Sequence, residues 1–484
     1  MRLLIVGLVG GLVLLGVWLG WGSSVVQANE PPPQLATSCP PSIPFGELFD
    51  CAISALGERD SYDFNATTND SFIIRMLRTS GTLRPQITVR NQNGVVVCTD
   101  LTDGALLTLS CTATSSGAYT LEVNSFTNAA TGNYQFYMQR LNGVGNATPL
   151  SFGVLVQASL ASAIESNTYS FTASQNDLVR LRLYRTSGTM RPQVRVFNAA
   201  GVEQCGSYAF DALITLENCA LDEAGDYSVL IDSQASVGPG NYDLHVQRLT
   251  NPGAAVPITA GSVITGTLGR VAELDVFQLE AEANDQLILR LVKETGAFRP
   301  RLSVLNSNGT NLCSSYSFDV VVTIEPCALP ASGTYSILVD DQSLASTGGY
   351  RLHVQRRNNP GQANPISFGQ TLAGSVRTIA DFSTYSFEAK VSDQVQLTMR
   401  RTAGAFRPRV TVYNPNGVLV CSTYSFGSEA SKTCDLTVDG THTIIADDQS
   451  LAAVGTYTLN LACTSGRCGP AGAQQSVYLP MVRR

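Results

Sequence analysis

A fourfold internal repeat constrains the fold of this chain more than any other feature. The dipeptide Arg-Pro recurs at near-constant spacing, and each copy leads through an apolar stretch to an Asn-x-x-Gly turn. The dipeptides begin at Arg84, Arg191, Arg299 and Arg407, and the turns begin at Asn91, Asn198, Asn306 and Asn414. Because a repeat of roughly 100 residues is long enough for one domain, the chain is predicted to contain four copies of a single domain in tandem.

Each repeat has the residue pattern of a β domain. In the second repeat, Val179, Leu181 and Leu183 alternate with polar residues, and Tyr169 and Phe171 lie two positions apart. Each set therefore faces one side of a strand. The proline after each arginine lacks a backbone N–H and marks the start of the next strand. The fold class is predicted to be all-β, with four tandem antiparallel β-sandwich or jelly-roll modules in an elongated array.

The repeat also gives the expected domain boundaries. The segments between repeats are short and rich in Asn, Pro, Gly and Ala, so we expect them to permit bending but not wide separation. The predicted parts are a signal peptide at 1–28, a proline-rich segment at 29–43, four modules at 44–145, 146–252, 253–361 and 362–463, and a linker with a C-terminal tail at 464–484.

Residues 1–28 have the composition of an export signal. Arg2 gives a positive start, an almost wholly apolar stretch follows, and Ala28 ends a run with small residues where signal peptidase prefers them. The alternative is an uncleaved membrane anchor, because the apolar stretch is long enough to span a bilayer. Both interpretations predict a secreted or cell-surface protein.

Twelve cysteines in an exported chain indicate disulfide bonds rather than metal or redox sites. One pair follows the third strand of every repeat, which predicts a local disulfide across a hairpin in each module. Closing such a loop is worth roughly 3 kcal/mol in the chain-entropy model. The predicted local pairs are Cys98/Cys111, Cys205/Cys219, Cys313/Cys327 and Cys421/Cys434, and the predicted terminal pairs are Cys39/Cys51 and Cys463/Cys468.

The sequence lacks a recognisable catalytic constellation. His245 and His353 occupy the same strand position, where other repeats have Tyr137 and Asn460, which predicts a surface site without a catalytic role. The sequence motifs of zinc hydrolases and serine esterases do not occur. The net charge of −7 argues against a nucleic-acid partner, which usually requires a basic face. The protein is predicted not to be an enzyme, with no catalytic or metal-binding residues.

Paired acidic residues allow two interpretations. Asp340-Asp341 and Asp447-Asp448 precede the same Gln-Ser-Leu-Ala run, whereas the first repeat has Asn124 at this position. Clustered carboxylates could form a calcium loop, since hard cations prefer oxygen ligands. Alternatively, Asp and Ser side chains cap loop amides. The loss of acids toward the first repeat favours caps, so no cofactor is expected, with calcium as the open alternative.

Two sets of residues are candidates for ligand binding. The Arg-Pro arginines could hold carboxylates or sulfates, or they could maintain the repeat by pairing with acids and carbonyls. The tyrosines of a Cys-x-x-Tyr-x-Phe motif, present in the last three repeats, could form an exposed platform or pack beside the disulfide. The candidate residues are Arg84, Arg191, Arg299, Arg407, Tyr208, Tyr316 and Tyr424.

The order of these elements resembles a known family. A Tyr-x-Phe strand, an apolar strand, a Pro-led strand, an Asn-x-x-Gly turn and two Gly-x-Tyr strands follow one another as in the bacterial pre-peptidase C-terminal domain, a β-sandwich that often trails secreted proteases. The resemblance covers roughly residues 44–462. It implies binding or spacing rather than catalysis, because members in secreted collagenases bind collagen and calcium. This chain departs from the pattern, since no peptidase precedes the modules and every module has its own cysteine pair.

The tail at 477–484 resembles the short Tyr/Phe-Leu-Pro-x-Val-x-Arg ending of exported Chloroflexota proteins. The resemblance implies a sorting or anchoring tag. The alternative is a frayed or strand-pairing terminus.

Together these features favour a secreted or cell-surface, non-catalytic repeat protein that acts as a spacer or adhesive scaffold. The alternative is a module array that binds a glycan or a protein through the tyrosine loops and arginines. The expected partners are an extracellular polysaccharide or a surface protein, with membrane contact only through an uncleaved leader or a tail-dependent anchor. A spacer predicts that these side chains are packed or paired, whereas a binding array predicts that they are exposed and aligned on one side.

Overall fold

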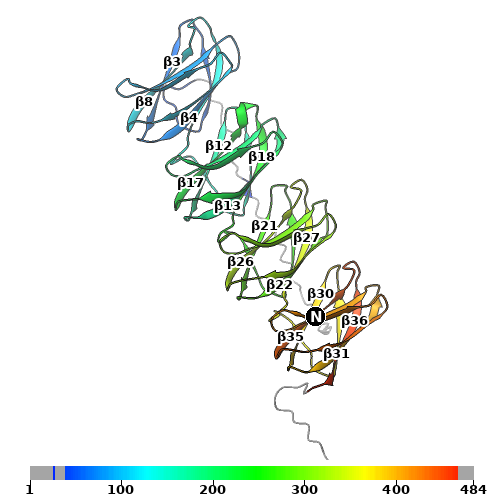
Figure 1. Ribbon diagram of the computed structural model, residues 1–484. Helices are drawn as coiled ribbons and strands as arrows, with labels where there is room; N and C mark the ends of the chain where they lie inside the picture. Colours follow the sequence, from blue (N-terminus) through cyan, green and yellow to red (C-terminus); the bar gives the residue numbers. More distant parts are fainter. Residues whose placement is uncertain (1–25, 28–38, 467–484) are drawn as a thin grey trace, which may run out of the picture.

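Four β-sandwich modules follow one another in a single row (Figure 1). A computed structural model of the chain describes residues 26–27 and 39–466. The all-β fold class is confirmed. The signal peptide apart from Val26 and Gln27, most of the proline-rich segment and the C-terminal tail lie outside the described residues. No helix within 26–27 and 39–466 is long and apolar enough to cross a membrane.

The strands fall into four equivalent groups. Module 1 contains β2 (Leu48–Ile53), β3 (Arg59–Ala66), β4 (Ser71–Arg78), β5 (Pro85–Asn91), β6 (Val96–Leu101), β7 (Leu106–Thr112), β8 (Gly117–Ser125) and β9 (Gly132–Arg140). Module 2 contains β10 (Thr148–Pro149), β11 (Leu155–Leu160), β12 (Ser166–Ala173), β13 (Asp177–Gly188), β14 (Pro192–Phe197), β15 (Glu203–Tyr208), β16 (Leu213–Leu221), β17 (Gly225–Ser233), the short 3-10 helix η1 (Gln234–Ser236) and β18 (Gly240–Arg248), and β1 (Val26–Gln27) pairs with β11.

The last two modules repeat this series. Module 3 contains β19 (Val256–Ile258), β20 (Val263–Leu268), β21 (Asp275–Ala281), β22 (Gln286–Lys293), β23 (Pro300–Leu305), β24 (Asn311–Tyr316), β25 (Val321–Ala328), β26 (Gly333–Asp341) and β27 (Gly348–Arg356). Module 4 contains β28 (Asn364–Pro365), β29 (Gln370–Val376), β30 (Phe382–Ala389), β31 (Gln394–Gly404), β32 (Pro408–Tyr413), β33 (Leu419–Tyr424), β34 (Glu429–Asp435), β35 (Gly440–Asp448) and β36 (Gly455–Ser465).

Each module consists of two facing sheets. In module 1 the strand orders are β2-β9-β4-β7 and β3-β8-β5-β6. Modules 2 to 4 repeat both orders with equivalent strands, and a short parallel strand (β10, β19 or β28) extends the second sheet of each. The junctions described below lie on the outward faces of these sheets.

The core of each module lies between its sheets. In module 2, Val179, Leu181 and Leu183 of β13 and Val194 and Val196 of β14 are all buried in one cluster. The alternation seen in the sequence therefore places these side chains on the inner faces, where burying each is worth about 1.5–3 kcal/mol.

The tyrosines of the Gly-x-Tyr strands also belong to the core. The Tyr227 hydroxyl donates to the carbonyl oxygen of Glu223, four residues earlier, at 2.8 Å, and Tyr119 and Tyr335 make the equivalent bond. In module 4, His442 takes this place, and its Nδ1 lies 3.0 Å from the Gly440 carbonyl oxygen. The buried tyrosine hydroxyl is thus satisfied in modules 1 to 3. In module 4 the Nε2 of His442 has no hydrogen-bond partner among the described residues.

One disulfide links the two sheets of each module. The four local pairs form as the spacing predicts, but the predicted hairpin is wrong, because the chain crosses between these two strands from one sheet to the other. A further disulfide joins Cys39 to Cys51 of β2. The predicted partner of Cys463, Cys468, lies outside the described residues. The local bonds are Cys98–Cys111, Cys205–Cys219, Cys313–Cys327 and Cys421–Cys434.

Candidate functional site

Modules 2, 3 and 4 each expose a cluster of one tyrosine, one phenylalanine and one arginine, which we call the platform. In module 3, Tyr316 and Phe318 are 51% and 66% exposed, and their ring centroids lie 5.6 Å apart with the rings edge to face. The Arg299 guanidinium lies 4.9 Å from the centre of the Phe318 ring, a cation–π distance. The other two platforms have the same geometry and consist of Tyr208, Phe210 and Arg191, and of Tyr424, Phe426 and Arg407.

The period of the edge strand directs the platform tyrosine outward. Tyr316 ends β24, and Cys313 lies three positions earlier on the same strand. Because side chains alternate along a strand, Cys313 turns inward to its disulfide while Tyr316 turns to solvent. The candidate tyrosines are therefore not packed beside the disulfides. Their exposure agrees with one part of what the binding hypothesis predicts.

Module 1 has no equivalent platform. Leu101 occupies the tyrosine position of β6, and the Arg84 guanidinium pairs with Asp103 at 2.8 Å. Within residues 39–466, the guanidinium groups of Arg191, Arg299 and Arg407 form no ion pair, so their N–H groups are available to a ligand. The four candidate arginines are therefore not equivalent, although the sequence motif is the same.

The Arg-Pro motif has a structural role as well. The backbone N–H of Arg299 donates to Asp341 at 2.7 Å, and that of Arg407 donates to Asp448 at 2.8 Å. A further arginine lies six residues before the Arg-Pro dipeptide of repeats 1, 2 and 4. It holds the intervening loop, because its guanidinium donates to a carbonyl oxygen five residues later. These bonds are Arg78 to Leu83, Arg185 to Met190 and Arg401 to Phe406.

A hollow lies beside the platform of module 3. It has a volume of about 290 Å³ and is lined by Arg301, Ser314, Ser315 and Tyr316. Two serine hydroxyls and a guanidinium next to an exposed ring offer hydrogen bonds and an apolar face together. The volume is near the lower limit of small-molecule sites.

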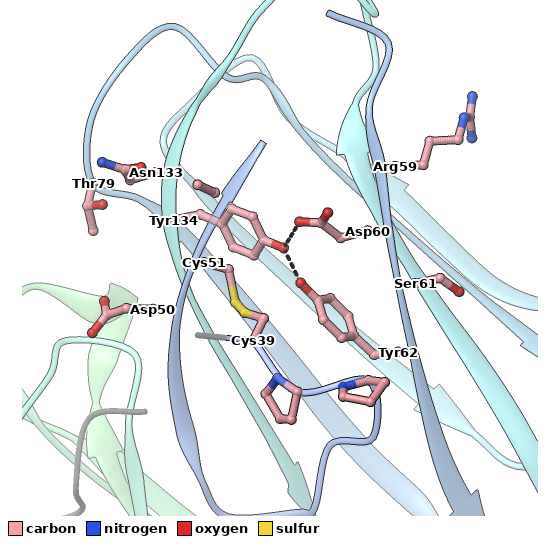
Figure 2. A pocket seen from close by; sticks show the side chains of 13 residues that line it. Cys39, Asp50, Cys51, Arg59, Asp60, Ser61, Tyr62, Thr79, Asn133 and Tyr134 are labelled. Atoms are coloured by element: carbon pink, nitrogen blue, oxygen red, sulfur yellow. Dashed lines mark hydrogen bonds between the residues drawn. A yellow bond between two sulfur atoms is a disulfide. The ribbon is translucent and has the colours of Figure 1, made fainter. Parts of the chain in front are cut away.

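A wider cleft of about 760 Å³ lies in module 1, next to the Cys39–Cys51 disulfide (Figure 2). There the Tyr134 hydroxyl donates to Asp60 at 2.6 Å and lies 2.7 Å from the Tyr62 hydroxyl. Burial raises the pKa of Asp60, and the hydrogen bond from Tyr134 opposes this in part. These bonds belong to the sandwich rather than to a special site, because the same tyrosine pair recurs as Tyr169 with Tyr242 and Tyr385 with Tyr457.

A buried ion pair joins each module to the next. Arg182 of module 2 projects into module 3, where it donates to the Asp340 carboxylate and, at 3.2 Å, to the Glu273 carbonyl oxygen. The Arg182 and Asp340 side chains are 0% and 3% exposed. Asp340 also accepts a hydrogen bond from Arg301 of its own module at 2.7 Å. The other junctions contain Arg75 with Asp232 and Arg195, and Arg290 with Asp447 and Arg409.

Apolar and polar contacts surround these ion pairs. At the junction of modules 2 and 3, Leu249 packs against Leu274 and Leu338 of the next module. At the junction of modules 3 and 4, the Tyr413 hydroxyl donates to Glu325 across the interface. The modules thus meet through packed interfaces, which restrict bending more than the composition of the linkers predicts.

The prediction that His245 and His353 lie on the surface is wrong. They are buried at junctions, opposite Arg182 and Arg290 on the neighbouring strands. Burial lowers the pKa of His245 to about 3 with help from the Arg182 charge. Burial likewise lowers the pKa of His353 to about 4, although Asp381 opposes this shift. The strand period does point both rings away from their own core, but the next module covers that face.

The paired acids have protein partners. Asp340 forms the junction ion pair, and Asp341 caps a loop by accepting from the Ser343 hydroxyl and from the N–H groups of Ala345 and Ser346. Burial alone would raise the pKa of Asp341, but these hydrogen bonds lower it. The capping interpretation therefore fits Asp341 and Asp448, which has equivalent bonds. In the described part of the chain, no group of three or more His, Cys, Asp or Glu could hold a metal ion.

Comparisons with known proteins give only partial likenesses. No protein-family model matches the chain. No curated protein matches it in sequence either.

The pre-peptidase C-terminal domain of a collagenase from Bacillus anthracis is 16% identical, with a TM-score of 0.19, over 22% of this chain and 98% of that one. Tandem CBM51 modules of a glycoside hydrolase from Streptococcus pneumoniae are 9% identical, with a TM-score of 0.15, over 40% and 83%. The BSP domain of a biofilm associated protein is 10% identical, with a TM-score of 0.15, over 88% and 97%. Such scores carry no argument about function, and the β-sandwich rests on the strand order of the chain itself.

Proposed function

We propose that the chain is a secreted or cell-surface, non-catalytic protein that displays three equivalent binding platforms on a stiff row of modules. The observation that carries this proposal is the Tyr–Phe–Arg platform, exposed with the same geometry in modules 2, 3 and 4. Clustered exposed aromatic rings are a recurrent mark of interaction surfaces. Their exposure favours the binding hypothesis over a bare spacer. The resemblance of the repeat to pre-peptidase C-terminal domains implies binding or spacing rather than catalysis.

The chemistry of the platform favours a polysaccharide that bears carboxylate or sulfate groups. The exposed rings of Tyr316 and Phe318 offer apolar surface for the C–H face of a sugar ring. The Arg299 guanidinium, already oriented by its stack on Phe318, can donate paired hydrogen bonds to an anionic group. Ser314 and Ser315 beside Tyr316 add hydroxyl partners for a polyol.

The row of modules suits a polymer better than a small ligand. Each platform is open to solvent and should bind one unit weakly. Three platforms held by packed junctions present the same chemistry at regular intervals, so a repeating polymer can occupy them together. Linked sites of this kind can exceed the affinity of a single site by roughly 10²–10⁴-fold.

The first prediction concerns the platform tyrosines. The mature protein is applied to an array that contains alginate, polygalacturonate, chondroitin sulfate, neutral dextran and extracellular matrix proteins, with and without calcium. We expect retention on acidic polysaccharides, and we expect a Tyr208→Ser/Tyr316→Ser/Tyr424→Ser variant to lose it by roughly 10²-fold, because three linked contacts fail together. These side chains are half exposed, so the substitutions should leave the fold intact.

Leu101→Ser is the matched control, because Leu101 takes the tyrosine position in module 1 but has no platform. It should bind like the unmodified protein. If the protein is retained on matrix proteins but not on polysaccharides, and the tyrosine variant loses this retention, the platform is the binding site but its ligand is a protein. Binding that the triple tyrosine variant leaves unchanged would refute the platform as the site.

A further inference from the structure

We infer that the modules couple through two complementary faces in a fixed direction, and that modules 1 and 4 each lack the face that would continue the series. The donor face of a module presents the junction arginine (Arg75, Arg182 or Arg290). The acceptor face of the next module presents the junction aspartate (Asp232, Asp340 or Asp447). The outer faces of modules 1 and 4 differ from both the donor face and the acceptor face. They act as caps that prevent association with a second copy of this chain.

The outer face of module 4 has lost the donor residues. Strand pairing places Thr398 opposite Asn460 in module 4, where module 3 has Arg290 opposite His353. The adjacent pair Arg400 and Glu429 is exposed. It stands where module 3 has the apolar pair Val292 and Val321. An acceptor face docked here would find no buried arginine and would bury two charged side chains instead.

The outer face of module 1 has lost the acceptor residues. Asn124 stands opposite Arg59 in module 1, where module 4 has Asp447 opposite Phe382. Glu122 takes the place of Ile445, and Arg90 takes the place of Tyr413. Arg59 and Arg90 both pair with Glu122 on this surface, so the face satisfies its own charges.

The energetics of burial make these exchanges effective. A buried arginine without its carboxylate is strongly destabilising, by about 3–5 kcal/mol in comparable cases. A donor face that met module 1 would place its arginine against Asn124 and near two further arginines. Terminal repeats with polar outer faces are the usual way in which repeat arrays avoid open-ended stacking. In modules 1 and 4 the polar substitutions occupy the same positions that form the internal junctions in the other modules.

The experiment restores each face in the full mature chain with the residues of the native junction between modules 3 and 4. The tail-opened variant carries Thr398→Arg, Arg400→Val, Glu429→Val and Asn460→His. Gln86 lies opposite Asn124 in module 1, where module 4 has Arg409 opposite Asp447. The head-opened variant therefore carries Arg59→Phe, Gln86→Arg, Arg90→Tyr, Glu122→Ile and Asn124→Asp. Sedimentation equilibrium is measured from about 10 µM to 1 mM, a range that includes the millimolar effective concentration that a short linker supplies.

Each variant alone should remain monomeric, because its other end is still capped, and an equimolar mixture should double in mass. A chain with both sets of substitutions should form longer, concentration-dependent oligomers. The matched control carries the other three tail-opened substitutions but keeps Thr398, and it should not associate with the head-opened variant. If both variants keep native circular dichroism and the mixture stays monomeric at 1 mM, the coupling faces are refuted. Association of the unmodified protein, cross-linked between modules 1 and 4, would refute the caps.

Discussion

Replacing Asp340 with alanine is expected to lower the free energy of unfolding at the junction of modules 2 and 3 by about 3–5 kcal/mol. The Arg182 side chain is fully buried, and an arginine cannot lose its charge at any ordinary pH. Removal of the carboxylate leaves this cation without its counter-ion in a buried site, where the Glu273 carbonyl oxygen is a neutral acceptor. The module interface then either opens to hydrate Arg182 or keeps an unpaired charge.

The consequence is measured by differential scanning calorimetry and by small-angle X-ray scattering. The transitions of modules 2 and 3 should move to lower temperature, and the scattering should report a bend at one joint. Asn124→Ala is the matched control, because Asn124 takes the aspartate position in module 1 but meets no arginine from another module. It should cost about 1 kcal/mol. Equal losses in both variants would contradict a junction ion pair.

The second large effect is a loss of stability in mild acid caused by His245 and His353. In the folded protein the pKa is about 3 for His245 and about 4 for His353. In an unfolded chain the pKa of both rings is about 6.5. Both pKa values are depressed, so the contribution of these rings is fully present above pH 6.5 and declines as the pH falls toward 4. Over that window each histidine should lower the free energy of unfolding by about 1.4 kcal/mol per pH unit.

The charged groups around these rings do not cancel the effect. Arg182 and Arg180 face His245, while Arg290, Arg351 and Asp381 face His353. Burial alone would raise the pKa of Asp340, but the hydrogen bond from Arg301 and the charge of Arg182 lower it. The junction carboxylate therefore stays ionised in this window.

The measurement is the melting temperature of modules 2 and 3 at pH 7, 6, 5 and 4. A His245→Gln/His353→Gln variant, which cannot titrate, should show a flatter profile over the same range. A steep decline that persists in this variant would assign the acid sensitivity to other groups.

The alternation of apolar residues was enough to predict the sandwich. Val179, Leu181 and Leu183 share a face because the strand period is two, and no neighbour is needed to place them. The local disulfides follow from the same register. The two-sheet crossing at each disulfide could not be predicted, because a tight hairpin and a crossing between sheets leave the same cysteine spacing.

The junctions could not be predicted from one module. Arg182 alternates with the core leucines, so the pattern places it on the outer face, where a charged residue is expected to meet water. The structure covers that face with the next module, which buries both Arg182 and His245. The comparison of repeats nevertheless indicates the junctions. Thr398 replaces the junction arginine only in module 4, and Asn124 replaces the junction aspartate only in module 1.

The platforms were predicted in part. The repeat identifies the tyrosines and arginines as candidates, but the sequence alone leaves packing beside the disulfide as an equal alternative. Cys313 and Tyr316 are three positions apart, so their side chains lie on opposite faces of the strand. This spacing shows that the ring faces solvent only when the strand is known to be an edge strand. The difference between Arg84, paired with Asp103, and the other three arginines depends on a loop contact that the motif does not contain.

Packed junctions hold the platforms of modules 2, 3 and 4 in one fixed arrangement. Small-angle X-ray scattering of the unmodified protein tests this arrangement at both low and high salt. We expect a curve that one row of four modules, arranged as in Figure 1, reproduces at both salt concentrations, because buried ion pairs are poorly screened. A curve that requires an ensemble of widely different bends between modules would contradict it.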